Sequence, residues 1–221
     1  YGPLREERIE RAVRSLKAGR RLLTEARGNI MTDFKLHDIP NTVAGAAQQI
    51  TDGGESLAFT VHASGGEQAL REAVSKVGSS KVLAVTVLTS LDTEECQSIF
   101  GDEPREKVIQ FAKMAGKAGV RGIVCSPLEA HFVRKAGLEP WTPGVRLETD
   151  SKDDQARVLT PGAAIANGAE RVIVGRTITK AKDKVAAAKA VAADIKVALD
   201  IVAESNARKA ANESSDDETR V

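Results

Sequence analysis

Residues 81–88 read Lys-Val-Leu-Ala-Val-Thr-Val-Leu, a run that is apolar or β-branched almost throughout. Continuous runs of this kind are typical of strands buried on both faces, as in parallel sheets. Further strands are predicted at 57–62, 121–126 and 171–175, at the short mixed run 29–36, and more weakly at 138–143. Helical spacing predicts helices over 5–26, 42–50, 104–118, 127–136, 161–167 and about 182–203, with another opening after Ser64-Gly65-Gly66. The sequence therefore predicts a helix followed by six βα units.

Strands that alternate with helices imply an α/β fold with a parallel sheet and right-handed crossovers. Two architectures fit, an open doubly wound sheet and a (β/α)8 TIM barrel. The sequence lacks both glycine-rich phosphate motifs, G-x-G-x-x-G and G-x-x-x-x-G-K-[ST], that often mark nucleotide-binding open sheets. Polar residues instead follow nearly every strand, where barrel active sites are built. A barrel domain over 1–204 is the better interpretation, with a polar, disordered tail over 205–221.

Composition excludes several classes of function. Lys and Arg (32) nearly cancel Asp and Glu (31), and aromatic residues are only 3%, so nothing favours binding to nucleic acid. An anionic ligand would need a local site. No apolar stretch approaches the roughly 20 residues of a membrane span. Cys96 and Cys125 lie far apart, which favours a reducing cytoplasm over a disulfide framework.

The most informative polar segment is residues 33–42, Asp-Phe-Lys-Leu-His-Asp-Ile-Pro-Asn-Thr. Strand alternation places Asp33 and Lys35 on one face. A carboxylate and an ammonium that point into a barrel must pair with each other or serve a ligand, because an unpaired buried charge is costly. Asp38 either caps a helix that begins at Pro40 or belongs to a site at the rim. Spacing alone leaves a structural ion pair and a catalytic set equally open.

The string D-x-K-L-H-D-I-P-N-T-V at 33–43 resembles the signature of orotidine 5'-phosphate decarboxylases. Its D-x-K-x-x-D core is shared with barrel enzymes that act on sugar phosphates, and the extension His-Asp-Ile-Pro-Asn-Thr-Val points to the orotidylate branch. Four further segments agree in order: 60–66, 85–90, 142–146 and 174–179. The resemblance runs from Tyr1 to about Ala203.

The resemblance implies a cytoplasmic enzyme of pyrimidine biosynthesis that converts orotidine 5'-monophosphate to UMP and CO2. It implies that Lys35 delivers a proton to C6 of the pyrimidine and that Asp33 lies close to the substrate carboxylate. It also implies a homodimer in which Asp38 reaches the neighbouring site. No metal and no cofactor are expected.

The same resemblance implies a set of substrate-binding positions. They are Asp33, Lys35, Asp38, Ile39, Pro40, Asn41, Thr42, Thr89, Ser90, Arg146, Gln155, Gly175 and Arg176. Thr89 and Ser90 would meet the pyrimidine, or else cap a helix. Gly175 and Arg176 would hold the phosphate, or else form a strand-ending turn and a surface charge. Arg146 would lie near the phosphate, and Gln155 would come from a loop that closes over the ligand.

The chain departs from the family in its strand count. A (β/α)8 barrel has eight strands, and only six are found. The two strands that the family carries ahead of the segment beginning at Tyr1 are not present, so we expect an N-terminally truncated barrel whose own activity is in doubt. Two alternatives remain: a non-catalytic fragment that binds nucleotide or dimerises, and a metal-dependent sugar-phosphate decarboxylase or synthase of the same barrel superfamily.

Overall fold

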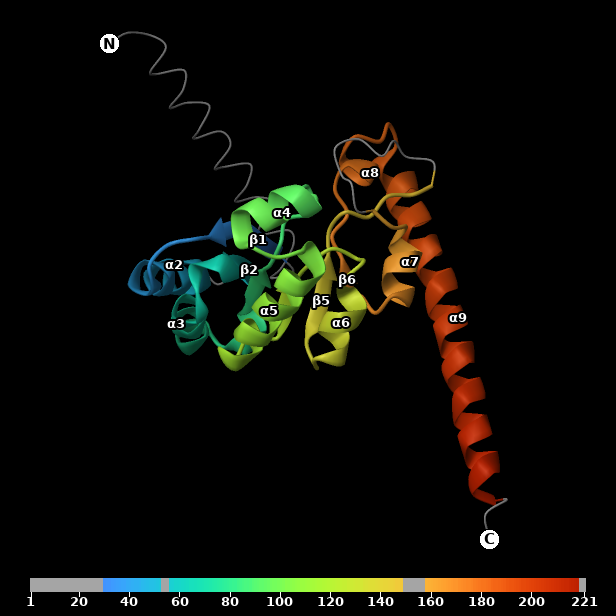
Figure 1. Ribbon diagram of the computed structural model, residues 1–221. Helices are drawn as coiled ribbons and strands as arrows, with labels where there is room; N and C mark the ends of the chain where they lie inside the picture. Colours follow the sequence, from blue (N-terminus) through green and yellow to red (C-terminus); the bar gives the residue numbers. More distant parts are fainter. Residues whose placement is uncertain (1–29, 53–55, 149–157, 219–221) are drawn as a thin grey trace.

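The computed structural model describes residues 30–52, 56–148 and 158–218 (Figure 1). Six parallel strands form one sheet in the order β1-β2-β3-β4-β5-β6. They are β1 (Ile30–Leu36), β2 (Ser56–His62), β3 (Val82–Val85), β4 (Gly122–Val124), β5 (Glu139–Thr142) and β6 (Arg171–Val172). The six strands predicted from the sequence are therefore confirmed. The helix predicted over 5–26 lies outside the described residues.

Helices connect each of the first five strands to the next, as a parallel sheet requires, and two more follow β6. The helices are α2 (Pro40–Asp52), α3 (Glu67–Val77), α4 (Thr93–Phe100), α5 (Pro104–Lys117), α6 (Ala130–Lys135), α7 (Pro161–Ala166), α8 (Arg176–Thr179) and α9 (Lys184–Glu218). Short 3-10 turns at Ala63–Gly65 and Ser79–Lys81 complete the connections. Figure 1 shows α2, α3, α5 and α6 along one side of the sheet and the long α9 extending toward the C-terminus.

The last helix corrects one prediction. It does not end near Ala203 but continues to Glu218, through most of the segment predicted to be a polar tail. Residues 203–211 are rich in Ala, Glu, Arg and Lys, which are strong helix formers, and polarity alone does not distinguish an exposed helix from a disordered segment. Arg208 and Glu204 also pair at helical spacing, 3.9 Å apart.

Apolar side chains pack on both faces of the sheet. Phe59, Val61, Val82, Ala84 and Ile123 join one buried cluster that also takes residues of α2, α3 and α5. The alternate residues form a second cluster on the opposite face: Ala58, Leu83, Val85, Val124 and Trp141, with Met31 and Ile173 packed against it. Since successive strand residues point to opposite faces, this double burial explains why residues 82–85 are apolar without interruption.

The sheet has two ends within the described part of the chain. There, β1 pairs only with β2, and β6 pairs only with β5. A cleft of about 700 Å³ is lined by Met31 of β1, Trp141 of β5, Ile173 beyond β6, and Ile195 and Leu199 of α9. The observed architecture is thus part of a (β/α)8 barrel, with six parallel strands where a whole barrel has eight.

Close packing between α7 and α9 depends on Gly162. Its backbone N–H donates to Asp194 Oδ2 at 2.6 Å, and a Cβ added there would lie 2.6 Å from the Asp194 carbonyl oxygen. Gly162→Ala is therefore expected to lower the free energy of unfolding by about 1–3 kcal/mol, because backbone cannot move aside cheaply.

Gly45 in α2 provides the matched control, since an added Cβ would meet nothing within 4 Å. Gly45→Ala should leave stability unchanged or raise it by up to about 1 kcal/mol. Urea denaturation of both variants measures the difference. Equal stabilities for the two variants would contradict the packing account.

Candidate active site

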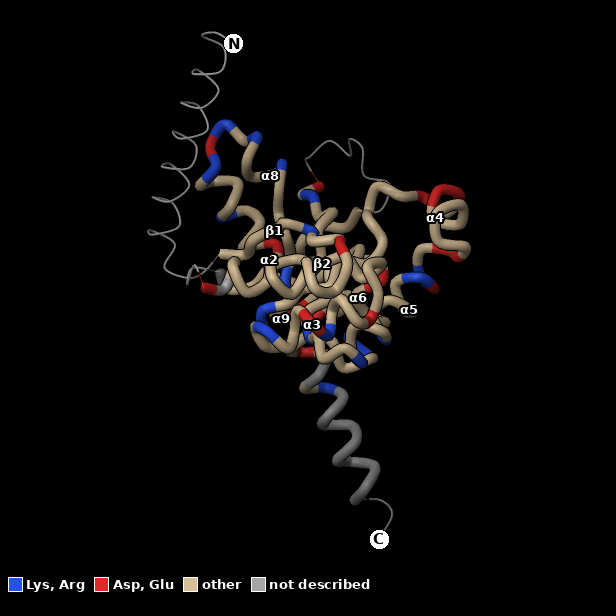
Figure 2. Tube along the Cα trace, turned by 90° about the vertical axis from the view of Figure 1, so that its left-hand side faces the viewer, with Lys and Arg blue, Asp and Glu red and all other residues tan. Residues whose placement is uncertain are grey.

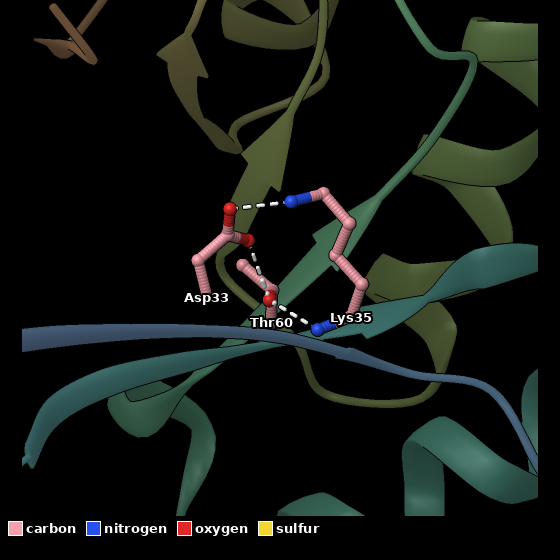
Figure 3. Close-up of polar contacts among 3 residues, drawn as sticks. All are labelled: Asp33, Lys35 and Thr60. Carbon is pink, nitrogen blue, oxygen red and sulfur yellow. Dashed lines mark hydrogen bonds and ion pairs between the residues drawn. The ribbon is translucent and has the colours of Figure 1, made fainter. Parts of the chain in front are cut away.

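Asp33 and Lys35 of β1 and Thr60 of β2 form one connected group (Figure 3). The Lys35 ammonium pairs with Asp33 Oδ2. The Thr60 hydroxyl donates to Asp33 Oδ1 at 2.9 Å and accepts from the Lys35 backbone N–H at 2.8 Å. The pairing of Asp33 and Lys35 on one side of β1 agrees with the prediction from strand alternation.

The backbone of Lys35 is unusual for a strand residue. Its φ is +50°, and within the described residues it is the one non-glycine position with positive φ. The register between β1 and β2 shifts between Thr32 and Leu36 at the same place. A non-glycine residue held in this region costs on the order of 1–3 kcal/mol, and such strain concentrates at functional sites. Local strand periodicity contains no signal for it.

A cavity of about 260 Å³ opens beside this group. Its lining residues are Asp33, Lys35, Thr60, Val85, Val87, Leu88, Thr89, Ser90, Val124, Cys125, Pro143 and Ile173. Every one of the six strands contributes, either from its last residues or from the segment just after it. The cavity therefore lies at the carboxyl ends of the strands, where barrel enzymes bind their substrates. Apart from Asp33 and Lys35 its walls are apolar or neutral.

Thr89 and Ser90 lie in the cavity wall, in the segment between β3 and α4. They do not cap the following helix. Asp92 is the N-cap of α4: its side chain accepts from Glu95 N at 2.9 Å, and Glu95 reaches back to Asp92 N at 3.4 Å. The two hydroxyl side chains therefore remain available to a ligand.

Asp38, Ile39, Pro40, Asn41 and Thr42 lie outside the cavity wall. α2 begins at Pro40, two residues before the start predicted at Thr42, and Asp38 accepts a hydrogen bond from Ile39 N at 2.7 Å. Asp38, Asn41 and Thr42 are exposed, and 67% of Ile39 is exposed. This segment forms a surface beside the strand ends.

The candidate phosphate-binding residues come shortly after residues of the cavity wall in the sequence. Arg146 follows Pro143 by three positions, is 8% exposed, and donates to the Val145 carbonyl oxygen at 2.9 Å. Gly175 is the N-cap of α8, and Arg176 is its first residue. None of the three lines the cavity itself. Gln155 lies outside the described residues.

His62 and His37 lie next to the charged pair. Their rings are 5.3 Å apart, and His37 Nε2 is 3.4 Å from Ser64 Oγ. Burial lowers the pKa of His62 below its ordinary value, and the nearby His37 and Lys35 lower it further while Asp33 opposes them. His62 is thus favoured as a neutral imidazole. Within the described ranges, no three or more His, Cys, Asp or Glu side chains gather as a metal site would require.

The lowered pKa of His62 makes stability depend on pH. The unfolded chain binds the proton more readily than the folded one, so the contribution is complete above about pH 6.5 and is lost as the pH falls toward the folded-state pKa. Between about pH 7 and pH 5, the melting temperature of His62→Gln should therefore fall less than that of the parent protein. Thermal melts across that range measure it, and identical pH slopes would count against the assignment.

Residues 13–191 match the family model described as "Orotidine 5'-phosphate decarboxylase / HUMPS family". The chain belongs to this family. An orotidine 5'-phosphate decarboxylase from Anaeromyxobacter dehalogenans is 47% identical over 171 residues, which cover 75% of each chain. Another from Halorhodospira halophila is 43% identical over 202 residues, 83% of this chain and 85% of the relative. The resemblance seen in the motif at 33–43 is confirmed.

A solved member of the orotidine 5'-phosphate decarboxylase / HUMPS family shares the fold. The crystal structure of orotidine 5'-phosphate decarboxylase from Lactobacillus acidophilus matches with a TM-score of 0.62 at 32% identity over 75% of each chain.

The sequence predicted no role for Thr60. Its signal was a polar side chain within the otherwise apolar run 57–61, two residues before His62.

No helix in the described ranges combines the length and apolar character needed to cross a membrane.

Proposed function

We propose that this protein decarboxylates orotidine 5'-monophosphate to UMP and CO2. The observation that carries the proposal is the Asp33–Lys35 pair at one side of an otherwise apolar or neutral cavity at the strand ends. A pyrimidine can lie against the apolar wall while its reacting edge meets the two charged groups. Thr89 and Ser90 supply hydroxyl groups for the polar edge of the base.

The chemistry follows from the two charges. The bond between C6 and the carboxylate carbon breaks, CO2 leaves, and the electron pair stays on C6. Lys35 Nζ delivers a proton to C6, and the lysine later regains a proton from solvent. Asp33 holds the ammonium in place and lies on the side where the substrate carboxylate must sit, so departure of CO2 relieves the repulsion between two anions.

The phosphate needs positive charge near the cavity mouth. Figure 2 shows Lys and Arg gathered around α8 and the segment after it. These residues are Arg176, Lys180, Lys182 and Lys184. Because the net charge of the chain is only +1, this local cluster is the feature that favours a phosphate there. In the proposal, Gly175 and Arg176 bind the phosphate, Arg146 lies near it, and Gln155 closes over the ligand.

The proposal includes a homodimer in the cytoplasm. The segment 38–42 supports the dimer, because its exposed Asp38 and Ile39 do not line the cavity of their own chain and are free to meet another. Asp38 then completes the neighbouring site, together with Pro40, Asn41 and Thr42 at the start of α2. Cys96 and Cys125, both within the described residues, are buried thiols that do not form a disulfide, which suits a reducing compartment.

The decisive experiment is absorbance-monitored loss of orotidine 5'-monophosphate with the purified protein, run with and without EDTA. Turnover that resists EDTA is expected. Turnover abolished by EDTA and restored by a divalent metal would instead favour the metal-dependent sugar-phosphate enzymes that share the D-x-K-x-x-D core. Binding of UMP, measured by calorimetry, without any turnover would favour a nucleotide-binding protein.

A further inference from the structure

We propose that Thr60 is a positioning residue that sets the relative geometry of Asp33 and Lys35; the inference rests on the proposed decarboxylase function. Thr60 is 1% exposed and belongs to β2, whereas both charged residues belong to β1. It contacts each of them directly (Figure 3). Thr60 acts by positioning these two residues and takes no part in the proton transfer, whereas Lys35 donates the proton.

The hydroxyl of Thr60 both donates and accepts a hydrogen bond in this group. A threonine hydroxyl has one proton to donate, and this proton is directed at Asp33 Oδ1, 2.9 Å away. The same oxygen accepts from the Lys35 backbone N–H at 2.8 Å. Asp33 Oδ2 remains for the Lys35 ammonium. One hydroxyl therefore orients the carboxylate and anchors the backbone of the lysine at the same time.

The irregular register of β1 explains why the anchor is needed. Thr32 lies opposite Phe59 and Leu36 opposite Val61, so four steps along β1 face only two steps along β2. The excess residues leave the regular ladder, and Lys35 takes its left-handed conformation there. The Thr60 side chain supplies the acceptor for the Lys35 N–H, which keeps the lysine in this conformation instead of an extended one.

Thr60 is well suited to this task because it is itself rigid. Its β-branched side chain is restricted in χ1, and its strand is paired on both sides, with β1 and with β3. A site residue held by such a support keeps its geometry without loss of entropy on substrate binding. By contrast, Asp33 and Lys35 are exposed and would sample several rotamers without it.

The test compares Thr60→Val, which removes the hydroxyl and keeps the shape, with Thr60→Ser, which keeps the hydroxyl. Thr86→Val is the matched control: Thr86 is also buried and donates to the Val124 carbonyl oxygen at 2.8 Å, but it does not line the cavity. Thr60→Val should lower kcat per UMP-binding site by roughly 10–100-fold, with the UMP dissociation constant changed by less than about threefold. Thr60→Ser and Thr86→Val should stay within about threefold of the parent kcat.

A second measurement does not depend on turnover. Amide hydrogen exchange at Lys35, followed by NMR, should speed up at least about tenfold in Thr60→Val and remain slow in Thr60→Ser. If the valine variant does not fold, Thr60→Ala replaces it with the same expectations. Unchanged exchange at Lys35, or equal loss of kcat in Thr60→Val and Thr86→Val, overturns the inference. Absence of both turnover and UMP binding in the parent protein contradicts the proposed function instead, and the exchange measurement still decides the role of Thr60.

Discussion

Lys35→Ala is expected to lower kcat by roughly 10²–10⁴-fold, the range that a positioned general acid contributes. The variant removes the proton that C6 must receive when CO2 leaves. Folding should be little affected, because the Lys35 and Asp33 side chains are 42% and 47% exposed and an ion pair so exposed to solvent contributes only about 0–1 kcal/mol. Stopped assays of UMP formation measure the loss, and thermal melts check the fold.

Two further variants separate proton delivery from charge. Lys35→Arg keeps a cation that can pair with Asp33, but a guanidinium does not give up its proton at neutral pH, so this variant should be as inactive as Lys35→Ala. Lys196→Ala removes an exposed lysine of α9 and should keep the parent rate. Substantial turnover by Lys35→Arg would mean that the positive charge, and not the proton, is what the reaction needs.

Mixing two inactive variants is expected to restore activity if Asp38 acts across a dimer interface. Lys35→Ala lacks the proton donor and Asp38→Ala lacks the partner's carboxylate, so each homodimer should be inactive. In a heterodimer, the intact Lys35 of one chain meets the intact Asp38 of the other at one of the two sites. Random exchange of subunits should then recover about one quarter of the parent activity, since half of the dimers are mixed and half of their sites are complete.

The position of Asp38 motivates this expectation. It is exposed and absent from the cavity wall of its own chain, although it follows Lys35 by only three residues. Sedimentation of the mixture would verify that dimers form and exchange. No recovery of activity in a mixture that demonstrably contains heterodimers would show that Asp38 serves its own chain. Recovery with Asp33→Asn in place of Asp38→Ala would not be expected, because Asp33 lies in the same site as Lys35.

Much of the site could be predicted from the sequence. Asp33 and Lys35 are two residues apart on a strand, which predicts that they share a face, and the structure pairs them. Thr89 and Ser90 were expected beside the base, and they line the cavity. The positions of Arg146, Gly175 and Arg176 relative to the cavity were harder to predict. These residues follow the strands through loops, and the local sequence pattern does not specify the paths of loops. The end of α9 was misjudged because polar composition is common to exposed helices and disordered tails.

The sequence by itself determined the six strands, their parallel arrangement and the burial of the central strands on both faces, because the period and apolarity of a run depend on its local environment. It also carried the family, through a short motif whose residues are neighbours along the chain. Only the tertiary structure decided the left-handed backbone of Lys35 and the role of Thr60. The hydroxyl and the lysine amide are 25 residues apart, and they meet because β1 and β2 pair with a shifted register. Register and long-range hydrogen bonds depend on how strands assemble, and no local periodicity records that.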